Sequence, residues 1–167
     1  GWRLLSDEFG TFCPQRRRFI ALLKPVALKN QSIDLIHAFA PGAPLGPLFP
    51  KTRKGTVAHL AADRDAVDRR HEWVRPGAVV MPRWAADAPL SLQRMAPHVM
   101  FGSLAFNAFN YQDNGERGFD AVSHLTAVCS GWQLSYSRLD DALAALDRLW
   151  LQVREEQHQR SPLAEPA

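Results

Sequence analysis

Apolar residues recur every three or four positions in the C-terminal half of the chain, and this spacing predicts three helices. The first is expected over Pro97–Tyr111, because proline suits the first position of a helix. The second is expected over Glu116–Cys129, with Gly131 placed to end it. The third follows the capping-box spacing of Ser137–Asp140. Its apolar face would consist of Leu143, Leu146, Leu149, Trp150 and Val153.

Short apolar runs separated by glycine, proline and charged residues occupy the rest of the chain and predict strands. A short helix with Ser32 as its N-cap is expected to run through Phe39 and to end at Pro41, and a second, exposed one is expected over Asp63–Glu72. The glycines and prolines of Phe9–Gln15 and Pro41–Pro50 predict loops. Strands are expected at Leu4–Leu5, Phe19–Leu23, Gly55–Leu60, Ala78–Pro82, Leu90–Leu92 and Trp132–Tyr136.

The composition is that of an ordinary globular domain, with 46% hydrophobic and 22% charged residues among 167. We expect one α/β domain over residues 1–157 and a frayed polar tail over residues 158–167. No apolar run approaches the length of a membrane span, and no charged-then-apolar leader opens the chain. We therefore expect a cytoplasmic protein without a membrane partner.

Two neighbouring carboxylates, Asp7 and Glu8, directly follow the strand predicted at Leu4–Leu5. Open α/β sheets bind their ligands at the carboxyl ends of strands. An acid pair there can hold a metal ion or accept a proton. The alternative is an acidic turn, which is the commoner use of such a pair.

The formal charge of +3 is unevenly placed, because basic residues form runs at 16–18 and 51–54. The second run opens onto a glycine and suits an anionic substrate or nucleotide phosphates, with a solvated loop as the alternative. Its candidate phosphate- or substrate-binding residues are Lys51, Arg53, Lys54 and Thr56. The competing function is a non-catalytic module that uses these patches to engage nucleic acid or an acidic protein. No aromatic residue is interleaved with either run, which counts against nucleic acid.

The chain opens with G-W-R-L-L-S-D-E, which resembles the HPr kinase/phosphorylase strand that reads G-H-R-L-V-A-D-D and follows its phosphate-binding loop and helix. Phe106–Tyr111 together with Gly115 is similar to the family segment V-A-A-M-N-Y…G. Three further blocks resemble the HprK-related kinase A group in particular, and they are Pro25–Ile33, Leu45–Leu60 and Asn107–Phe119. The likeness covers about residues 1–150.

This resemblance implies an α/β fold with the mixed-sheet P-loop kinase core that HPr kinase shares with phosphoenolpyruvate carboxykinase, truncated at its N-terminus. It also implies an ATP-dependent kinase of a hydroxyl group, with ATP and Mg²⁺ as cofactors. The acceptor would be a protein serine or a small molecule, and a homo-oligomer is possible. The loop G-x-x-x-x-G-K-[ST], which the family carries just upstream of this strand, does not occur in these 167 residues. We expect the chain to be the C-terminal part of such a kinase, inactive alone.

The resemblance also assigns roles to single residues. Asp7 and Glu8 fall on the family's paired aspartates, so they are the catalytic and metal-binding candidates. Glu8 matches the proton-handling aspartate but reaches one methylene further, so the division of roles between the two stays open. Lys29 falls on the arginine of the signature E-I-R-G and would face phosphate, with a solvated strand-end lysine as the alternative. Ala27 replaces the metal-binding glutamate of that signature, so the metal site must differ.

Overall fold

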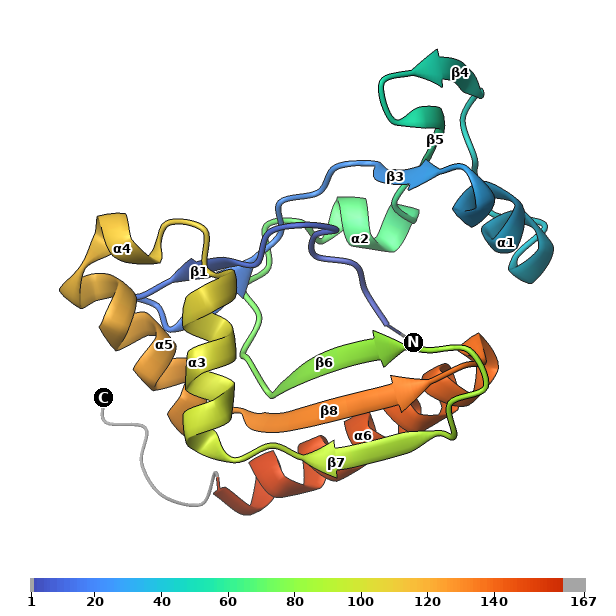
Figure 1. Ribbon diagram of the computed structural model, residues 1–167. Coiled ribbons are helices and arrows are strands. Elements are labelled where there is room, and N and C mark those ends of the chain that lie inside the picture. Colours follow the sequence, from blue (N-terminus) through green and yellow to red (C-terminus); the bar gives the residue numbers. More distant parts are fainter. Residues whose placement is uncertain (1, 161–167) are drawn as a thin grey trace. The chain divides into compact units, whose positions relative to one another are not determined.

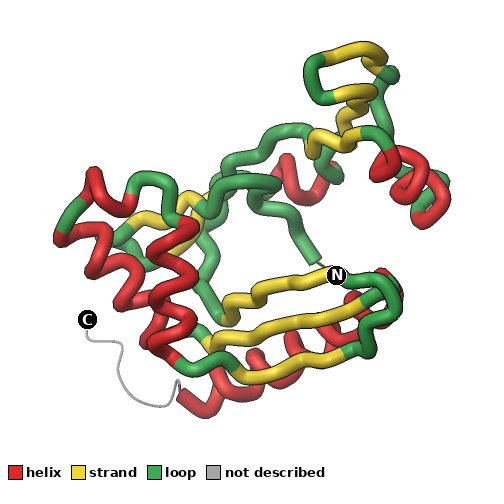
Figure 2. Tube along the Cα trace, in the orientation of Figure 1, coloured by secondary structure: helices red, strands yellow, loops and turns green. Residues whose placement is uncertain are grey.

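A computed structural model describes residues 2–160 of the protein (Figure 1). The chain forms two compact units. Unit 1 comprises residues 2–13 and 18–74, and unit 2 comprises residues 14–17 and 75–160. Sheets and helices occur in both units, and parallel and antiparallel pairing coexist in unit 2, so the protein is an α/β protein with a mixed sheet (Figure 2).

Unit 1 contains a short hairpin and a three-stranded antiparallel sheet. In the hairpin, β1 (Thr11–Cys13) pairs with β2 (Arg18–Ile20), and the rings of the opposed Phe12 and Phe19 lie 5.2 Å apart. The sheet has the order β3–β5–β4. Its strands are β3 (Val26–Lys29), β4 (Phe49–Thr52) and β5 (Gly55–Leu60).

Two helices complete unit 1. Helix α1 (Gln31–Phe39) covers one face of the β3–β5–β4 sheet, where its Ile33 packs against Leu28 and Ala58. This core is small, because it holds only these buried residues and a few half-buried neighbours. Helix α2 (Arg64–Asp68) is a short element whose N-cap, Asp63, accepts a hydrogen bond from the backbone N–H of Ala66 at 2.7 Å.

Unit 2 is a three-stranded sheet with a long helix on one face. Strand β8 lies in the centre, parallel to β6 and antiparallel to β7. The connection from β7 to β8 consists of three helices, of which α3 packs against α5. The elements are β6 (Ala78–Trp84), β7 (Ser91–Arg94), α3 (Pro97–Asn107), α4 (Tyr111–Asn114), α5 (Glu116–Val128), β8 (Ser130–Tyr136) and α6 (Leu139–Arg160).

Helix α6 runs along the β6–β8–β7 sheet and forms the main core of unit 2 with it (Figure 1). Leu134, in the central strand, is almost fully buried and packs against Ala142 and Ala145 of the helix. Further along, Trp132 packs against Leu149 and Val153. Small and large residues thus interdigitate across this interface, which brings the long helix close to the sheet.

Several strands differ from the sequence prediction. The strand expected at Leu4–Leu5 does not form, although Leu5 O accepts a backbone hydrogen bond from Leu22 N at 2.9 Å. The strand expected at Phe19–Leu23 is shorter and ends at Ile20. Conversely, β1 and β4 lie in segments predicted to be loops, since pairing partners from elsewhere in the chain supply their ladder bonds.

The helices differ mainly at their ends. The helix expected to reach Tyr111 ends at Asn107, and α4 follows as a separate turn. Gly131 does not end a helix but lies in β8, where an added Cβ would come 2.8 Å from Met100 Sδ. Ser32 is inside α1 rather than its N-cap. Helix α6 continues to Arg160 through the start of the predicted tail, and residues 161–167 lie outside the described residues.

Unit 2 contains a histidine whose titration should affect stability. Burial lowers the pKa of His124 on α5, and the positive charge of Arg17 in the turn at residues 14–17 lowers it further. The unfolded chain takes up this proton near the usual pKa of about 6.5. It therefore binds more protons than the folded protein below that pH, and the free energy of unfolding should decline as pH falls below about 6.5. Urea unfolding at about pH 7.5 and about pH 5.5 measures this decline.

The variant His124→Gln isolates the contribution of this side chain. We expect the stability of this variant to depend less on pH over this window than that of the original protein. An unchanged pH dependence in His124→Gln would show that other groups cause the decline.

Candidate functional site

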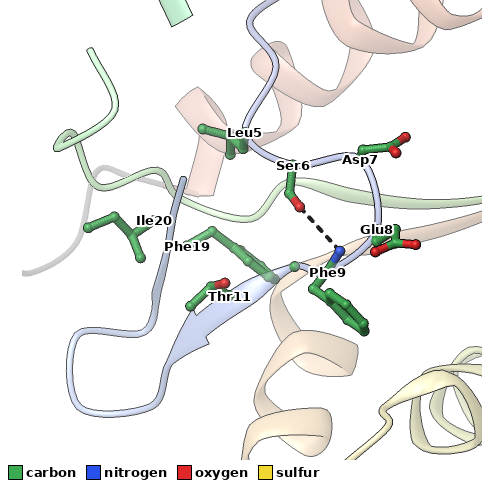
Figure 3. A pocket seen from close by; sticks show the side chains of 9 residues that line it. Leu5, Ser6, Asp7, Glu8, Phe9, Thr11, Phe19 and Ile20 are labelled. Atoms are coloured by element: carbon green, nitrogen blue, oxygen red, sulfur yellow. Dashed lines mark hydrogen bonds between the residues drawn. The ribbon is translucent and has the colours of Figure 1, made fainter. Parts of the chain in front are cut away.

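Asp7 and Glu8 lie in a bend, with both carboxylates exposed (Figure 3). The bend is stabilised by Ser6, whose Oγ accepts a hydrogen bond from the backbone N–H of Phe9 at 3.2 Å. The segment borders a pocket of about 160 Å³ within unit 1. The pocket is lined by Leu5, Ser6, Asp7, Glu8, Phe9, Gly10, Thr11, Phe19 and Ile20. Two acids therefore meet an apolar recess that the β1–β2 hairpin helps to form.

The segment that carries the acid pair is not a strand, but an arginine near its start anchors it. The side chain of Arg3 is only 14% exposed. Its Nη1 donates to the backbone oxygen of Arg69 at 2.7 Å and lies 3.2 Å from Glu72 Oε2. The hydrogen bond from Arg69 lowers the pKa of Glu72, and the charge of Arg3 acts in the same direction. Glu72 thus remains ionised and pairs with Arg3. Arg3 lies four residues before Asp7, so this ion pair fixes the start of the segment that carries the acids.

The donor set of the acid pair fits a magnesium ion that is held mainly by phosphate. Mg²⁺ is usually bound by one or two carboxylates together with substrate phosphates and water, not by a complete protein cage. Asp7 and Glu8 supply two exposed carboxylates next to a recess. Among the described residues, no three His, Cys, Asp or Glu side chains are placed to hold a metal by themselves.

The cationic candidates lie at one end of the β3–β5–β4 sheet. Lys29 ends β3 and pairs with Val57 of β5, two residues beyond the β4–β5 turn. The backbone N–H and C=O of Lys29 are both bonded to the hydroxyl of Ser32, each at 2.7 Å. Lys29 is exposed, which agrees with the alternative of a strand-end lysine in solvent. The structure also shows that this lysine lies beside the β4–β5 turn.

Asn30 joins this strand end to the basic turn. Its backbone N–H donates to Thr56 O at 2.9 Å, and its Oδ1 accepts from the backbone N–H of Thr56 at 3.1 Å. Its Nδ2 donates to Lys54 O at 3.4 Å. Three bonds from one residue thus hold the turn that carries Lys51, Arg53 and Lys54 next to Lys29.

The turn itself is closed by a threonine hydroxyl. Thr52 Oγ1 donates to Gly55 O at 2.7 Å and accepts from the backbone N–H of Lys54 at 3.1 Å. Two residues of the turn have positive φ angles, 59° at Lys51 and 86° at Gly55. Thr56 is half-buried, and both its backbone polar groups are bonded to Asn30, so it holds the turn rather than facing a ligand.

Gly55 should be the residue of this turn that tolerates change least. Its φ of +86° disfavours any side chain, and an added Cβ would collide with Asn30 Oδ1. We expect Gly55→Ala to lower the free energy of unfolding by about 1–3 kcal/mol and to break the Asn30 bonds to the turn. Urea unfolding measures the loss.

Gly42→Ala is the matched control, because an added Cβ at Gly42 meets no atom within 4 Å. It should leave stability within about 0.5 kcal/mol of the original. Equal losses of stability in the two variants would contradict the positive φ of Gly55 and its close contact with Asn30.

The structure therefore groups the predicted residues into two sets. Lys29 and the turn at residues 51–56 come together, although Phe49, where β4 begins, lies 20 positions after Lys29, beyond α1 and a loop. Within residues 2–160, no hydrogen bond or ion pair joins Asp7 or Glu8 to this basic set. Ala27 is exposed on β3 opposite His59 and offers no metal ligand.

Two residues of the site were not anticipated from the sequence. Asn30 adopts φ 49° and ψ −123°, and its residue type was the one available signal, because asparagine tolerates positive φ better than most residues. Arg3 gave no such signal, because its partners lie 66 or more positions away.

Two further observations bear on the class of protein. No helix in the described part of the chain is long and apolar enough to cross a membrane. Comparison with family models, with curated proteins and with solved structures found no match to this chain.

Proposed function

We propose that the chain is the C-terminal part of an ATP-dependent kinase of the HPr kinase-like type, which transfers phosphate to a hydroxyl group. In this proposal the α/β core is the mixed-sheet P-loop kinase core of that family. The phosphate-binding loop would come from residues that precede Gly1 in the complete protein, because these 167 residues contain no G-x-x-x-x-G-K-[ST]. The cytoplasm is the proposed location, since it supplies ATP.

The backbone of Asn30 is the observation that carries this proposal. The family signature E-I-R-G aligns with residues 27–30, so its glycine falls on Asn30. Asn30 has φ 49° and ψ −123°, a conformation that favours glycine over residues with a side chain. The local geometry thus supports the alignment at a position where the residue type itself differs. It also supports the placement of Lys29 at the signature's arginine.

Asp7 and Glu8 supply the groups that phosphate transfer to a hydroxyl requires. One carboxylate accepts the proton of the attacking hydroxyl, and the pair offers oxygen ligands toward the phosphates. Mg²⁺, when bound with ATP, neutralises charge on the phosphoryl group that is transferred. Arg3 positions the acid pair through its contacts with Arg69 and Glu72.

The basic set, which is Lys29 with the turn at residues 51–56, either forms part of the proposed site or lies next to it. Lys29, Lys51, Arg53 and Lys54 are exposed cations that can bind either nucleotide phosphates or an anionic acceptor. The same cations favour the competing function, a non-catalytic module that binds an acidic partner. Asp7 and Glu8 distinguish the two functions, because a kinase requires their carboxylates for phosphate transfer and a binding module does not.

The residues that precede Gly1 in the complete protein test this proposal. We expect G-x-x-x-x-G-K-[ST] about 10 to 20 residues before Gly1, a spacing set by the helix that must follow the loop. A complete protein without that loop would exclude the kinase and leave the binding module.

A further inference from the structure

The basic end of the β3–β5–β4 sheet is not neutralised by acidic side chains. Residues 18–62 contain six lysines and arginines but a single acid, Asp34 on α1. Within residues 2–160, no ion pair involves Lys29, Lys51, Arg53 or Lys54, and all four are exposed. These side chains are therefore available to an external anion.

Several other basic residues of the protein are paired with carboxylates. Arg69 binds Glu72 at 2.8 Å, and Arg64 lies 3.5 Å from Asp68, both within unit 1. In unit 2, Arg94 binds Glu156 at 2.8 Å and stacks over the Trp132 ring at 4.5 Å. The contrast shows that the chain supplies local carboxylates where its arginines serve the fold, and none at the sheet end.

The same end of the sheet also exposes apolar side chains. Leu28 and Ala58 pair across the sheet and face α1, so the next pair, Lys29 and Val57, points to the opposite face. Phe49 pairs with Val57 from the other side and joins this open face, where it is 49% exposed. Its neighbour Leu48 is 60% exposed. Lys29 and Phe49 therefore share the open face of the sheet, next to the turn that carries Lys51, Arg53 and Lys54.

We propose that this basic surface docks an acidic segment of the protein that accepts the phosphate. It consists of Lys29, Leu48, Phe49, Lys51, Arg53 and Lys54. The identification of the partner as the phosphate acceptor rests on the proposed kinase function, whereas the acidic character of the partner follows from charge complementarity.

The apolar part of the basic surface favours a polypeptide over nucleic acid. Single-stranded nucleic acid is held by successive aromatic rings that stack on its bases. The basic surface offers one such ring, and the imidazole of His59 already meets Phe49 edge-on at 6.2 Å. Leu48 is aliphatic and suits an apolar side chain among the acids of the partner.

Binding of a defined acidic peptide to the complete protein, without ATP, tests this inference. The probe is a fluorescein-labelled peptide in which glutamates and leucines alternate around one serine, and its binding is followed by fluorescence anisotropy. We expect saturable binding at about 0.15 M salt that weakens as salt rises. The same peptide with glutamines in place of glutamates should bind at least about tenfold more weakly.

Charge variants locate the binding. Combined Lys51→Gln, Arg53→Gln and Lys54→Gln should weaken peptide binding about tenfold or more, and Lys29→Gln alone about threefold. The control, Arg16→Gln with Arg17→Gln and Arg18→Gln, removes the same charge from the other basic run and should change binding less than about twofold. Circular dichroism shows whether each variant is folded. If the triple variant at residues 51, 53 and 54 does not fold, Lys29→Gln alone still tests the inference.

Three results would overturn the inference: no peptide binding, equal losses in both triple variants, or tighter binding of a single-stranded oligonucleotide through the same residues. Because ATP is absent, failure of the kinase proposal has a separate signature. A complete protein that binds the peptide but transfers no phosphate would retain the basic surface and lose the proposed function.

Discussion

Replacing Asp7 with Asn and Glu8 with Gln in the complete protein should slow the hydrolysis of Mg-ATP, in which water takes the place of the acceptor hydroxyl and phosphate is released, by about 100-fold or more. General acid–base catalysis contributes about 10²–10⁴-fold, and the double variant also removes both carboxylate ligands next to the recess. Asparagine and glutamine keep the size of the side chains, so the bend and its Ser6 hydrogen bond should remain. Steady-state phosphate release measures the effect.

A second acid pair provides the matched control. Glu116 and Asp120 are exposed on α5, outside the candidate site, and Glu116→Gln with Asp120→Asn removes the same charge. This control should keep full activity. If the Asp7 and Glu8 variant were as active as the control, the acid pair would have no catalytic role.

Replacing Leu134 with Ala should destabilise unit 2 by about 2–5 kcal/mol, the usual cost of emptying a buried leucine site. Leu134 is 1% exposed in the central strand β8 and packs against Ala142 and Ala145 of α6. The cavity would open between the sheet and the long helix, and alanines on the helix side cannot expand to fill it. Urea unfolding, followed by circular dichroism, measures the change.

Leu151→Ala on the same helix is the control for this experiment. Leu151 is 59% exposed, so its truncation should cost less than about 0.5 kcal/mol. Equal losses at the two positions would contradict the packing of α6 on the sheet.

Periodicity predicted the long helices well because a single local property determines them. Helix α5 was expected at Glu116–Cys129 and forms at Glu116–Val128, since Val122 and Leu125 recur on the face that is buried. Leu149 and Val153 mark α6 in the same way. Strands depend on partners from elsewhere, which explains why an apolar pair such as Leu4–Leu5 predicted a strand that does not form.

The sequence predicted which residues belong to the candidate site, but it did not predict how they are arranged in space. Charge and the family resemblance selected Lys29 and the turn at 51–56, yet their proximity comes from the pairing of β3 with β5. Asn30 holds them together, but it carries no charge and does not lie at the predicted end of any helix or strand. Long-range pairing of this kind cannot be inferred from a local pattern, because it depends on contacts between segments far apart in the chain.

Calorimetric titration of Mg-ATP into the complete protein and into the 167-residue chain tests the central claim most directly. We predict saturable binding by the complete protein and weak or no binding by the chain alone, because the chain contains no phosphate-binding loop. Equal affinity of the two proteins for Mg-ATP, or no binding by the complete protein, would contradict it.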